Sequence, residues 1–453
     1  MPEPVTDSQR INASPTKEFF ISMLVRDIPL SRAVIDLVDN SVDGARRLRD
    51  SRDFDGLWVR IEVHPTYFRI VDNCGGIPVA LARDYAFRFG RPRGAPPEVG
   101  SIGQFGVGMK RTFFKLGRRF RVQSTTAISR FTVEIDVDDW ITHQSAEGAE
   151  DWHFEFKTLE ENITVPPEQQ GTTIEIERLH ESVAESFGMA LFLNRLSQEI
   201  ALAHSLNLQR GLSVTLNSIP LEYDPMRLLH SEQLQPAFVE HLFDRFGPNP
   251  VRVKLYAGVS DRVKEEGGWY VFCNGRLVVK ADQTNLTVWG EGERVPKYHP
   301  DFARFRAFAF FDCDDSSLLP WTTTKTGVDI DSPVYRAVRQ EMIELTRPVL
   351  DFLRKVEDER KRSEDGEITD TPLAMALSTA QPFLVEALSP SLTFQAPQPP
   401  PQPQGLRMQR IQYRKPEDQV EKAKELLGVS TFKEVGEKTF ECYLAYEGGD
   451  SES

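Results

Sequence analysis

Residues 102–110 read IGQFGVGMK, and this stretch decides how the chain of 453 residues is expected to fold. Its three glycines come directly before an apolar segment at residues 113–116, for which the pattern predicts a helix. A glycine-rich turn that opens a helix can hold phosphate groups through backbone N–H donors and the helix dipole. The spacing fits neither the G-x-x-x-x-G-K-S/T loop nor the dinucleotide-binding G-x-G-x-x-G motif. The stretch therefore predicts a phosphate-binding loop of another type.

The segment that precedes this loop, residues 87–101, is rich in glycine, proline and arginine. Such a composition is typical of a mobile loop. We expect this segment to act as a lid over the bound phosphates.

A helix with an acidic stripe is predicted over residues 30–48, where apolar or small residues recur at helical spacing. Four short polar side chains at i, i+3, i+4 and i+7 share a second stripe: Asp36, Asp39, Asn40 and Asp43. A solvated face would normally carry Glu, Lys, Arg or Gln, because Asp and Asn compete for nearby backbone groups and disfavour helix interiors. The stripe therefore indicates a functional site rather than a surface.

A β-hairpin is predicted from the alternating residues 58–63 and a second strand at 67–71. It brings Asp72 to the end of a strand, directly before the sequence Asn-Cys-Gly-Gly. A carboxylate at this position can accept a hydrogen bond from an exocyclic amine, and glycines let a planar ring approach the backbone. An ordinary Asp-Asn-Gly turn would explain the same residues, so this pattern alone leaves both interpretations open.

Taken together, the three elements resemble the N, G1 and G2 motifs of the GHKL superfamily, which includes gyrase B subunits, large heat-shock chaperones, histidine kinases and MutL. Residues 102–108 resemble the chaperone form of the G2 box, whereas the continuation GMKRTFFKLG looks more like the MORC ATPases. The sequence GTTIEI at 171–176 resembles the strand that closes the pocket floor. The resemblance covers roughly residues 15–350.

This resemblance implies ATP and Mg²⁺ as ligands and gives individual residues a role. Asn40 matches the Asn that holds Mg²⁺, and Asp72 matches the Asp that reads the adenine amine. Thr173 matches the region of a Thr that supports adenine, with Thr172 an equal candidate. The nucleotide-binding residues implied in this way are Asn40, Asp72, Gly76, Ile77, Gly103, Gln104, Phe105, Gly106, Val107, Gly108 and Thr173.

Two positions depart from the superfamily's pattern. Asp36 stands where the general-base Glu is expected, four residues before the Mg²⁺ Asn, and its side chain is one methylene shorter. Because geometry governs the efficiency of a general base, we expect slow hydrolysis. Cys74 replaces the first glycine of the G1 box, and we expect it to be a small packing residue.

The second half of the chain is strand-rich between about residues 210 and 335, with strands predicted at 212–216, 251–256, 269–273 and 305–311. Asn274-Gly275 between two such runs predicts a hairpin. The resemblance implies a transducer domain here, and PWTTTKTG at 320–327 resembles the loop that sends a Lys to the γ-phosphate. Lys325 would be this sensor; the simpler interpretation is a solvated loop lysine.

The predicted fold class is α+β: an N-terminal GHKL (Bergerat) α/β sandwich followed by a transducer domain of the ribosomal-S5-like type. The expected domains are a GHKL ATP-binding domain at 1–205, a transducer at 206–355, a polar and Pro-rich linker at 356–405 and a C-terminal interaction segment at 406–453.

Smaller elements are predicted inside this division. A helix is expected at 334–362, which Pro348 should kink or split. One strand at 409–414 and helices at 416–427 and 432–443 are expected in the C-terminal segment. Because so few residues can hardly bury a core alone, we expect this segment to dock on a partner protein or on a second copy of the chain.

Composition restricts the cellular compartment and the partners that we expect for the protein. The four cysteines form no C-x-x-C pair, which favours a reducing compartment and argues against structural zinc. Neither a secretory signal nor an apolar run of membrane-spanning length is evident, so we expect a cytoplasmic protein without a membrane partner. The net charge of −14 disfavours wrapping by nucleic acid. Basic clusters at 46–52 and 110–121 still leave a local nucleic-acid contact possible.

Three functions are consistent with this sequence. The first is an ATPase (Asp36 as base, Lys325 as sensor) that closes as a homodimer on Mg²⁺–ATP and reopens after hydrolysis. The second is a nucleotide-binding scaffold with little or no hydrolysis, because Asp36 replaces the usual Glu. The third is a kinase, which ranks last because no histidine-bearing dimerisation helix is predicted before the ATP-binding domain. The biological process remains open, since function resides in sites rather than in folds.

Overall fold

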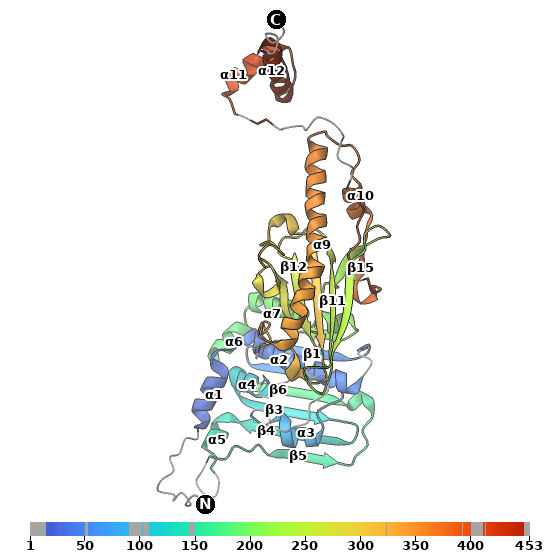
Figure 1. Ribbon diagram of the computed structural model, residues 1–453. Coiled ribbons are helices and arrows are strands. Elements are labelled where there is room, and N and C mark those ends of the chain that lie inside the picture. Colours follow the sequence, from blue (N-terminus) through green and yellow to red (C-terminus); the bar gives the residue numbers. More distant parts are fainter. Residues whose placement is uncertain are drawn as a thin grey trace, which may run out of the picture. The chain divides into compact units, whose positions relative to one another are not determined.

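The computed structural model of the protein describes residues 15–49, 53–89, 102, 108–144, 150–322, 324–391, 393–399, 411–412 and 414–447. Contacts divide the chain into two compact units, Met1–Pro400 and Pro401–Ser453, which are described separately. Helices and strands are mixed along the first unit (Figure 1), which agrees with the predicted α+β class.

An eight-stranded sheet carries the N-terminal part of the first unit, in the order β5-β4-β3-β6-β2-β1-β7-β8. Its strands are β1 Trp58–His64, β2 Tyr67–Asp72, β3 Gly117–Thr125, β4 Ser129–Asp136, β5 Phe156–Glu161, β6 Gly171–Leu179, β7 Ser213–Leu216 and β8 Ile219–Pro220. Neighbours are antiparallel except β1 and β7, which are parallel. The predicted hairpin is confirmed as β1–β2, and its register brings Val59 opposite Asp72.

Helices pack on this sheet because their apolar stripes face it (Figure 1). They are α1 Lys17–Arg26, α2 Leu30–Leu48, α3 Val79–Leu81, α4 Gly108–Leu116, α5 Val137–Thr142, α6 Glu181–Phe187, α7 Ala190–Ala203 and α8 Ser205–Gln209. The predicted helices at 30–48 and 113–116 are thus confirmed as α2 and α4. Val34, Val38 and Phe113 from these two helices are fully buried in the core.

Partly or fully exposed strand residues of this sheet form ion pairs with neighbouring strands and with α5. Arg69 lies 3.0 Å from Glu175, Arg119 lies 3.6 Å from Glu177, and Arg118 lies 2.9 Å from Asp138. Two of these arginines, Arg118 and Arg119, belong to the basic cluster that left a nucleic-acid contact open. Their pairing with carboxylates lowers the positive charge that this cluster could offer to phosphates.

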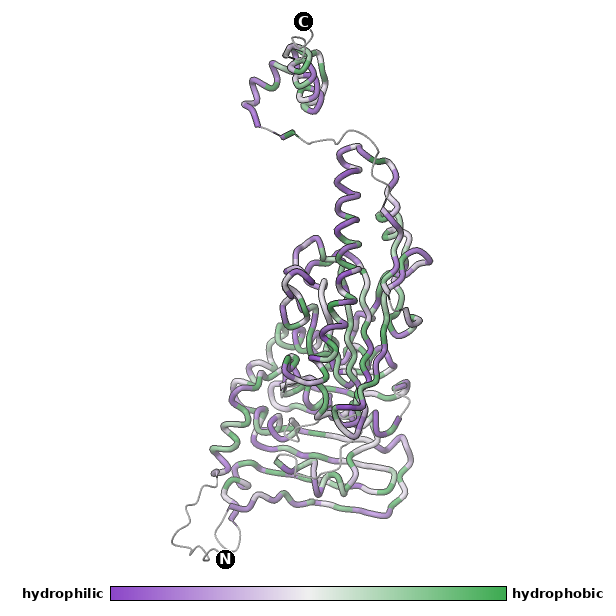
Figure 2. The backbone as a smooth tube through the Cα atoms, viewed as in Figure 1, coloured by the Kyte–Doolittle hydropathy of each residue, from purple (hydrophilic) through white to green (hydrophobic). Residues whose placement is uncertain are grey.

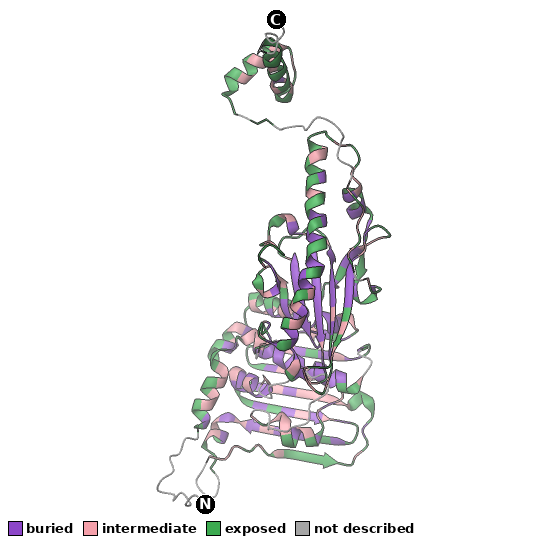
Figure 3. Ribbon diagram, in the orientation of Figure 1, coloured by how far each residue is buried: buried purple, intermediate pink, exposed green. Residues whose placement is uncertain are grey.

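A five-stranded sheet follows, in the order β10-β11-β14-β12-β13. Its strands are β10 Ala237–Phe243, β11 Val251–Val259, β12 Gly268–Cys273, β13 Arg276–Asp282 and β14 Phe305–Asp312. The predicted Asn274-Gly275 hairpin joins β12 to β13, with both turn residues at positive φ. The strands read as nearly continuous apolar runs because both faces of the sheet are covered, as the buried colouring in Figure 3 shows.

The long helix α9, Pro333–Glu364, packs against β11 and β14 of this second sheet. It is not split at Pro348, because buried residues such as Leu345 and Val349 on both sides of the proline hold it in the core. Its later turns are hydrophilic, as the purple colouring in Figure 2 shows. The opposite face of the sheet is covered by a second cluster that includes Leu228 from β9, Arg227–His230, and Val385.

Two sequence-based boundaries were wrong. The strand predicted at 212–216 was expected in the second domain, but β7 pairs with β1 and therefore extends the first sheet. The interval expected to be a linker contains α10 Pro372–Thr379, which packs on α9, and β15 Gln381–Leu384, which pairs with β9. Much of this interval is folded because its apolar residues find partners on the second sheet.

The described part of the second unit contains the helices α11 Glu417–Leu427 and α12 Phe432–Glu447, as predicted. Gly428 ends α11 in the left-handed region, and Thr431 with Glu434 forms a capping box at the start of α12. Among the described residues of this unit, Val435 alone is buried. Half of the predicted strand at 409–414 lies outside the described residues, and the residues described there, 411, 412 and 414, are not in a strand.

Three further observations bear on the sequence analysis. Within the described part of the chain, no helix has the length and apolarity that crossing a bilayer needs. Across the same residues, no group of three or more His, Cys, Asp or Glu side chains is arranged to hold a metal ion. The four cysteines are free thiols; Cys74, Cys273 and Cys313 are buried and Cys442 is exposed.

Candidate functional site

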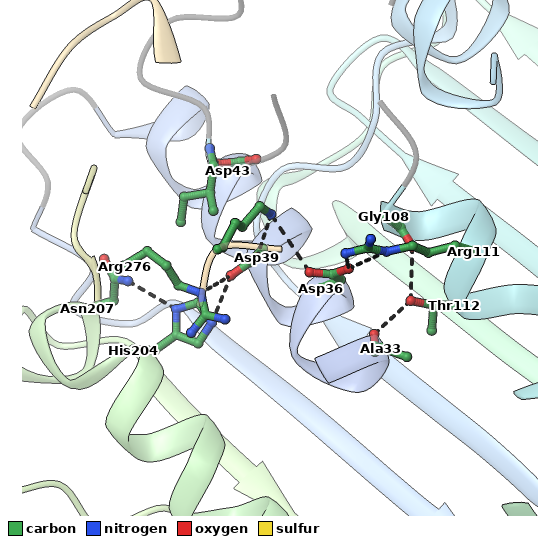
Figure 4. Close-up of polar contacts among 12 residues, drawn as sticks. Ala33, Asp36, Asp39, Asp43, Gly108, Arg111, Thr112, His204, Asn207 and Arg276 are labelled. Atoms are coloured by element: carbon green, nitrogen blue, oxygen red, sulfur yellow. Dashed lines mark hydrogen bonds and ion pairs between the residues drawn. The ribbon is translucent and has the colours of Figure 1, made fainter. Parts of the chain in front are cut away.

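The acidic stripe of α2 is buried and faces other parts of the fold. Relative exposure is 4% for Asp36, 0% for Asp39 and 6% for Asp43, and Figure 4 shows the three along the helix. Burial of three carboxylates is unfavourable unless each is paired or hydrogen-bonded. Their partners come from segments far away in the sequence, so α2 is the element around which the site is assembled.

Asp72 lies at the end of β2 and accepts three hydrogen bonds. Its Oδ2 accepts from Ser41 Oγ of α2 at 2.7 Å, and its Oδ1 accepts from the N–H groups of Cys74 and Thr172 at 2.9 and 3.1 Å. Burial raises the pKa of the Asp72 carboxyl, while these hydrogen bonds and Arg47 oppose that rise. The geometry fixes the carboxylate where β2, β6 and α2 meet.

Two glycines allow the backbone to close around Asp72. Gly171 has φ +151°, and a Cβ there would lie 1.9 Å from the carbonyl oxygen of Asp72. Gly76 has φ +73°, and a Cβ there would lie 2.3 Å from the carbonyl oxygen of Thr125. Only glycine fits at these positions. Sterics alone therefore require glycine at position 76, independently of any motif.

The neighbours of Gly76 are also engaged. Ile77 donates its N–H to Ser124 Oγ at 2.6 Å. Cys74 is buried, and burial raises the pKa of its thiol well above the ordinary value, with the nearby Asp72 adding to the rise. Cys74 is therefore a neutral packing residue, as its small size suggested.

Of the two candidate threonines, the structure brings Thr172 to Asp72. Thr172 is the register partner of Asp72 between β6 and β2, whereas Thr173 is opposite Val71. Directly opposite residues share one face of a sheet. Thr172 and Asp72 therefore share a face of the sheet, and the side chain of Thr173 belongs to the other face.

The predicted phosphate loop is tied to α2 at both ends. Residues 103–107, and with them Gly103, Gln104, Phe105, Gly106 and Val107, lie outside the described residues, as do 90–101 of the predicted lid. Before the loop, Ile102 donates its N–H to Asp43 Oδ1 at 2.6 Å. After it, a Cβ at Gly108 would lie 3.4 Å from Asp36 Oδ2, and Thr112 Oγ1 donates to the carbonyl of Ala33 at 2.7 Å. Asp36 thus borders the end of the loop.

Arg111, in the first turn of α4, binds the proposed general base. Its Nε and Nη2 donate to Asp36 Oδ2 at 3.0 and 2.6 Å. In the sequence, Arg111 stands out only as part of a basic cluster, although its place one turn after the glycine loop can be read there. The guanidinium therefore holds Asp36 Oδ2. The other oxygen, Oδ1, faces Lys325, whose Nζ lies 3.9 Å away.

Lys325 reaches α2 from a loop 286 residues away in sequence from Asp39. Its Nζ donates to Asp39 Oδ2 at 2.7 Å, and its relative exposure is 6%. The backbone of Lys325 has φ +54°, an uncommon conformation for a residue with a side chain. This burial excludes the interpretation of Lys325 as a solvated loop lysine.

The other oxygen of Asp39 faces two basic side chains that sequence analysis missed. Arg276 Nε lies 3.0 Å and His204 Nε2 lies 3.2 Å from Asp39 Oδ1. Burial alone would raise the pKa of Asp39, but Arg276, Lys325 and His204 bring it below its ordinary value. Burial lowers the pKa of His204, and Asn207 Nδ2 lies 3.2 Å from its Nδ1 (Figure 4). Burial therefore favours the neutral form of this imidazole.

The residues present fit Mg²⁺–ATP. Asn40 is on α2 one turn from Asp36, and its buried Nδ2 has no hydrogen-bond partner within the described structure. A side-chain amide oxygen is a ligand that Mg²⁺ accepts. Asp72 supplies a fixed acceptor for an amine. The side chains of Asn40 and Asp72 therefore suit the metal and the amine of this ligand.

Comparison with known families agrees with this geometry. Residues 28–172 match the family model described as "Histidine kinase-, DNA gyrase B-, and HSP90-like ATPase". This part of the chain is therefore a GHKL-type ATPase domain, which supports ATP binding. The match includes α2, Asp72 and Gly108, whereas His204, Arg276 and Lys325 lie outside it. No curated protein matches the chain.

Proposed function

We propose that this protein, whose residues 28–172 form a GHKL-type ATPase domain, hydrolyses Mg²⁺–ATP and works as a nucleotide-gated dimeric clamp. The observation that carries the proposal is the position of Lys325 between Asp39 and Asp36 on the nucleotide-binding helix. A lysine outside the ATPase domain can respond to the γ-phosphate only if its loop reaches this helix. A ligand shifts a conformational equilibrium only through contacts that differ between states.

Each described residue then has one task. Asp72, held by Ser41 and Thr172, accepts a hydrogen bond from the adenine amine. Asn40 holds Mg²⁺ through its side-chain oxygen, and the metal when bound neutralises phosphate charge. Asp36 takes the proton of the attacking water with Oδ1, since Arg111 occupies Oδ2. Lys325 stabilises the charge that develops on the transferred phosphoryl group.

The remaining parts of the proposal concern architecture. We assign the transducer role to the second sheet with α9, and keep the ribosomal-S5-like type and the MORC-like relationship as parts of the proposal. Dimerisation is proposed to depend on the nucleotide. The helices α11 and α12 are proposed to bind a partner protein, because the side chains of Phe440, Tyr443 and Tyr446 are largely exposed.

One observation favours the second candidate, a scaffold with little or no hydrolysis. Arg111 donates two hydrogen bonds to Asp36 Oδ2, which uses the lone pairs of that oxygen and holds the short side chain in place. A base held in this way approaches water less freely than a longer Glu would. Turnover of the wild-type protein above background decides between the two candidates.

Lys325→Ala tests the proposed function. The variant should retain ADP affinity, bind a non-hydrolysable ATP analogue at least tenfold more weakly, and fail to dimerise with it, because a charge-assisted hydrogen bond contributes about 1.5–3 kcal/mol. Calorimetry with both nucleotides and sizing by light scattering measure this. Alanine has a Cβ, as lysine does, so the positive-φ backbone is equally accessible to both residues and the change removes the side chain beyond Cβ. Lys264→Ala, at an exposed lysine of the second-sheet region, is the control. A Lys325→Ala protein that dimerises like wild type would refute the sensor role.

Asn40→Ala tests the metal assignment. The variant should weaken binding of Mg²⁺–ATP far more than binding of ATP in the presence of a chelator, because only the metal-bound form uses the amide oxygen. Calorimetry under both conditions gives the two losses on one protein sample. Equal losses would mean that Asn40 supports the helix and does not hold the metal.

A further inference from the structure

We propose that Asp39 restrains ATP binding by holding the ammonium of Lys325 until a γ-phosphate takes it away. The inference rests on the proposed ATPase function and concerns regulation of the same site. It gives a role to Asp39, a residue to which the motifs assign no contact with nucleotide or metal. ADP, which lacks the γ-phosphate, would leave Lys325 on Asp39.

The first step is that the two oxygens of Asp39 have different partners. Oδ1 faces Arg276 and His204, and Oδ2 accepts from Lys325 at 2.7 Å. Removing one partner of a buried ion pair is costly when the other charge is left without compensation. If Lys325 leaves, however, Arg276 still neutralises Asp39. The carboxylate can therefore release the lysine without becoming an isolated buried charge.

The second step is the short path that the ammonium has to travel. Lys325 Nζ is 2.7 Å from Asp39 Oδ2 and already 3.9 Å from Asp36 Oδ1. Asp36 lies against Gly108, where the phosphate loop ends. Movement of the ammonium from Asp39 toward Asp36 therefore brings it toward the bound phosphates. The loop that carries it is closed by a bridge between Trp321 and Val328, which keeps the start of the lysine side chain in place.

The third step is the difference between the two nucleotides. ATP must exchange the Asp39–Lys325 pair for a phosphate–Lys325 pair, so part of its binding energy is used to break a buried contact. ADP binds without this exchange. A ligand's apparent affinity falls when the competent conformation is only a minor fraction of the protein. The geometry therefore predicts that weakening Asp39 as a partner of Lys325 raises ATP affinity and leaves ADP affinity unchanged.

Two substitutions test this with opposite signs. Asp39→Asn keeps an oxygen for Arg276 but turns an amide N–H₂ toward Lys325, so the lysine is released. The ratio of affinities for a non-hydrolysable ATP analogue and ADP should rise about tenfold, within the usual range of coupling between sites. Arg276→Gln removes the permanent partner of Asp39 and makes the carboxylate depend on Lys325. The same ratio should fall.

The experiment is calorimetry on the full chain with both nucleotides. It compares the wild type, the single variants Asp39→Asn, Arg276→Gln and Lys325→Ala, and the double variant Lys325→Ala/Asp39→Asn. In the absence of Lys325, Asp39→Asn should no longer change the ratio. Arg306→Gln, at a buried arginine of the same sheet paired with Glu266 at 3.0 Å, controls for general loss of packing. If Asp39→Asn does not fold, the sign of the Arg276→Gln effect decides.

The outcomes separate the two proposals. Wild-type protein that binds neither nucleotide would overturn the proposed function and this inference with it. Normal nucleotide binding with an unchanged ratio in Asp39→Asn, or a raised ratio in Arg276→Gln, would overturn the inference alone. Opposite shifts in the two variants that disappear without Lys325 would support it.

Discussion

Asp36→Asn should bind ATP almost as tightly as the wild type and lose turnover by roughly two to four orders of magnitude, the usual contribution of a general base. The amide retains an oxygen for Arg111, which holds Asp36 Oδ2 at 2.6 Å, so the contact between α2 and α4 survives. The substitution replaces Oδ1 by an amide nitrogen, which cannot take a proton from water. Steady-state turnover together with calorimetry separates the chemical step from binding.

Two variants make this result interpretable. Arg111→Gln frees Asp36 Oδ2 and should raise the rate if the ion pair limits the base; Asp36→Glu restores the superfamily's usual reach and tests the same point from the other side. If the wild type has no turnover above background, the scaffold is the better description. An active wild type with an unchanged rate in Asp36→Ala would move the base to Asp39 or Asp43.

Elements with a strong local pattern could be predicted from the sequence. The helix α2, the β1–β2 hairpin, α4 and the Asn-Gly turn between β12 and β13 each depend on periodicity or turn chemistry within a few residues. The placement of β7 could not be predicted, because its four residues pair with a strand about 150 residues earlier. Docking of β15 on β9 is likewise a long-range contact, and a strand of four residues that contains a proline gives no local sign of it.

The candidate site divides in the same way. Asp36, Asp72 and Gly76 belong to recognisable boxes, so short segments sufficed to find them. His204 and Arg276 could not be found, because their role exists only where the junction of α7 and α8, the second sheet and α2 meet. A buried Asp on the stripe implied that some cation compensates it, but the sequence cannot say which. Three basic groups around one carboxylate arise from the tertiary fold.

Asp72→Asn should reduce ATP affinity by at least about a hundredfold while leaving the fold intact. The buried carboxylate accepts from two backbone N–H groups through Oδ1 and from Ser41 through Oδ2. Asn can keep the Oδ1 contacts and donate from Nδ2 to the Ser41 oxygen, so the local structure has a satisfied alternative. That alternative presents a donor where the adenine amine needs an acceptor. Two donors then face each other in a buried site, and a buried polar group left unpaired costs about 1–3 kcal/mol in addition to the lost bond.

Ser41→Ala is the matched control for this prediction. It removes the hydroxyl that donates to Asp72 Oδ2 at 2.7 Å but leaves the carboxylate and its charge in place, so ATP affinity should fall by less than in Asp72→Asn. Calorimetry gives both affinities, and thermal unfolding verifies that the variants remain folded. A folded Asp72→Asn protein with wild-type ATP affinity would remove Asp72 from the adenine pocket. Because Asp72 is where β2, β6 and α2 meet, that result would also require the nucleotide to bind elsewhere on the sheet.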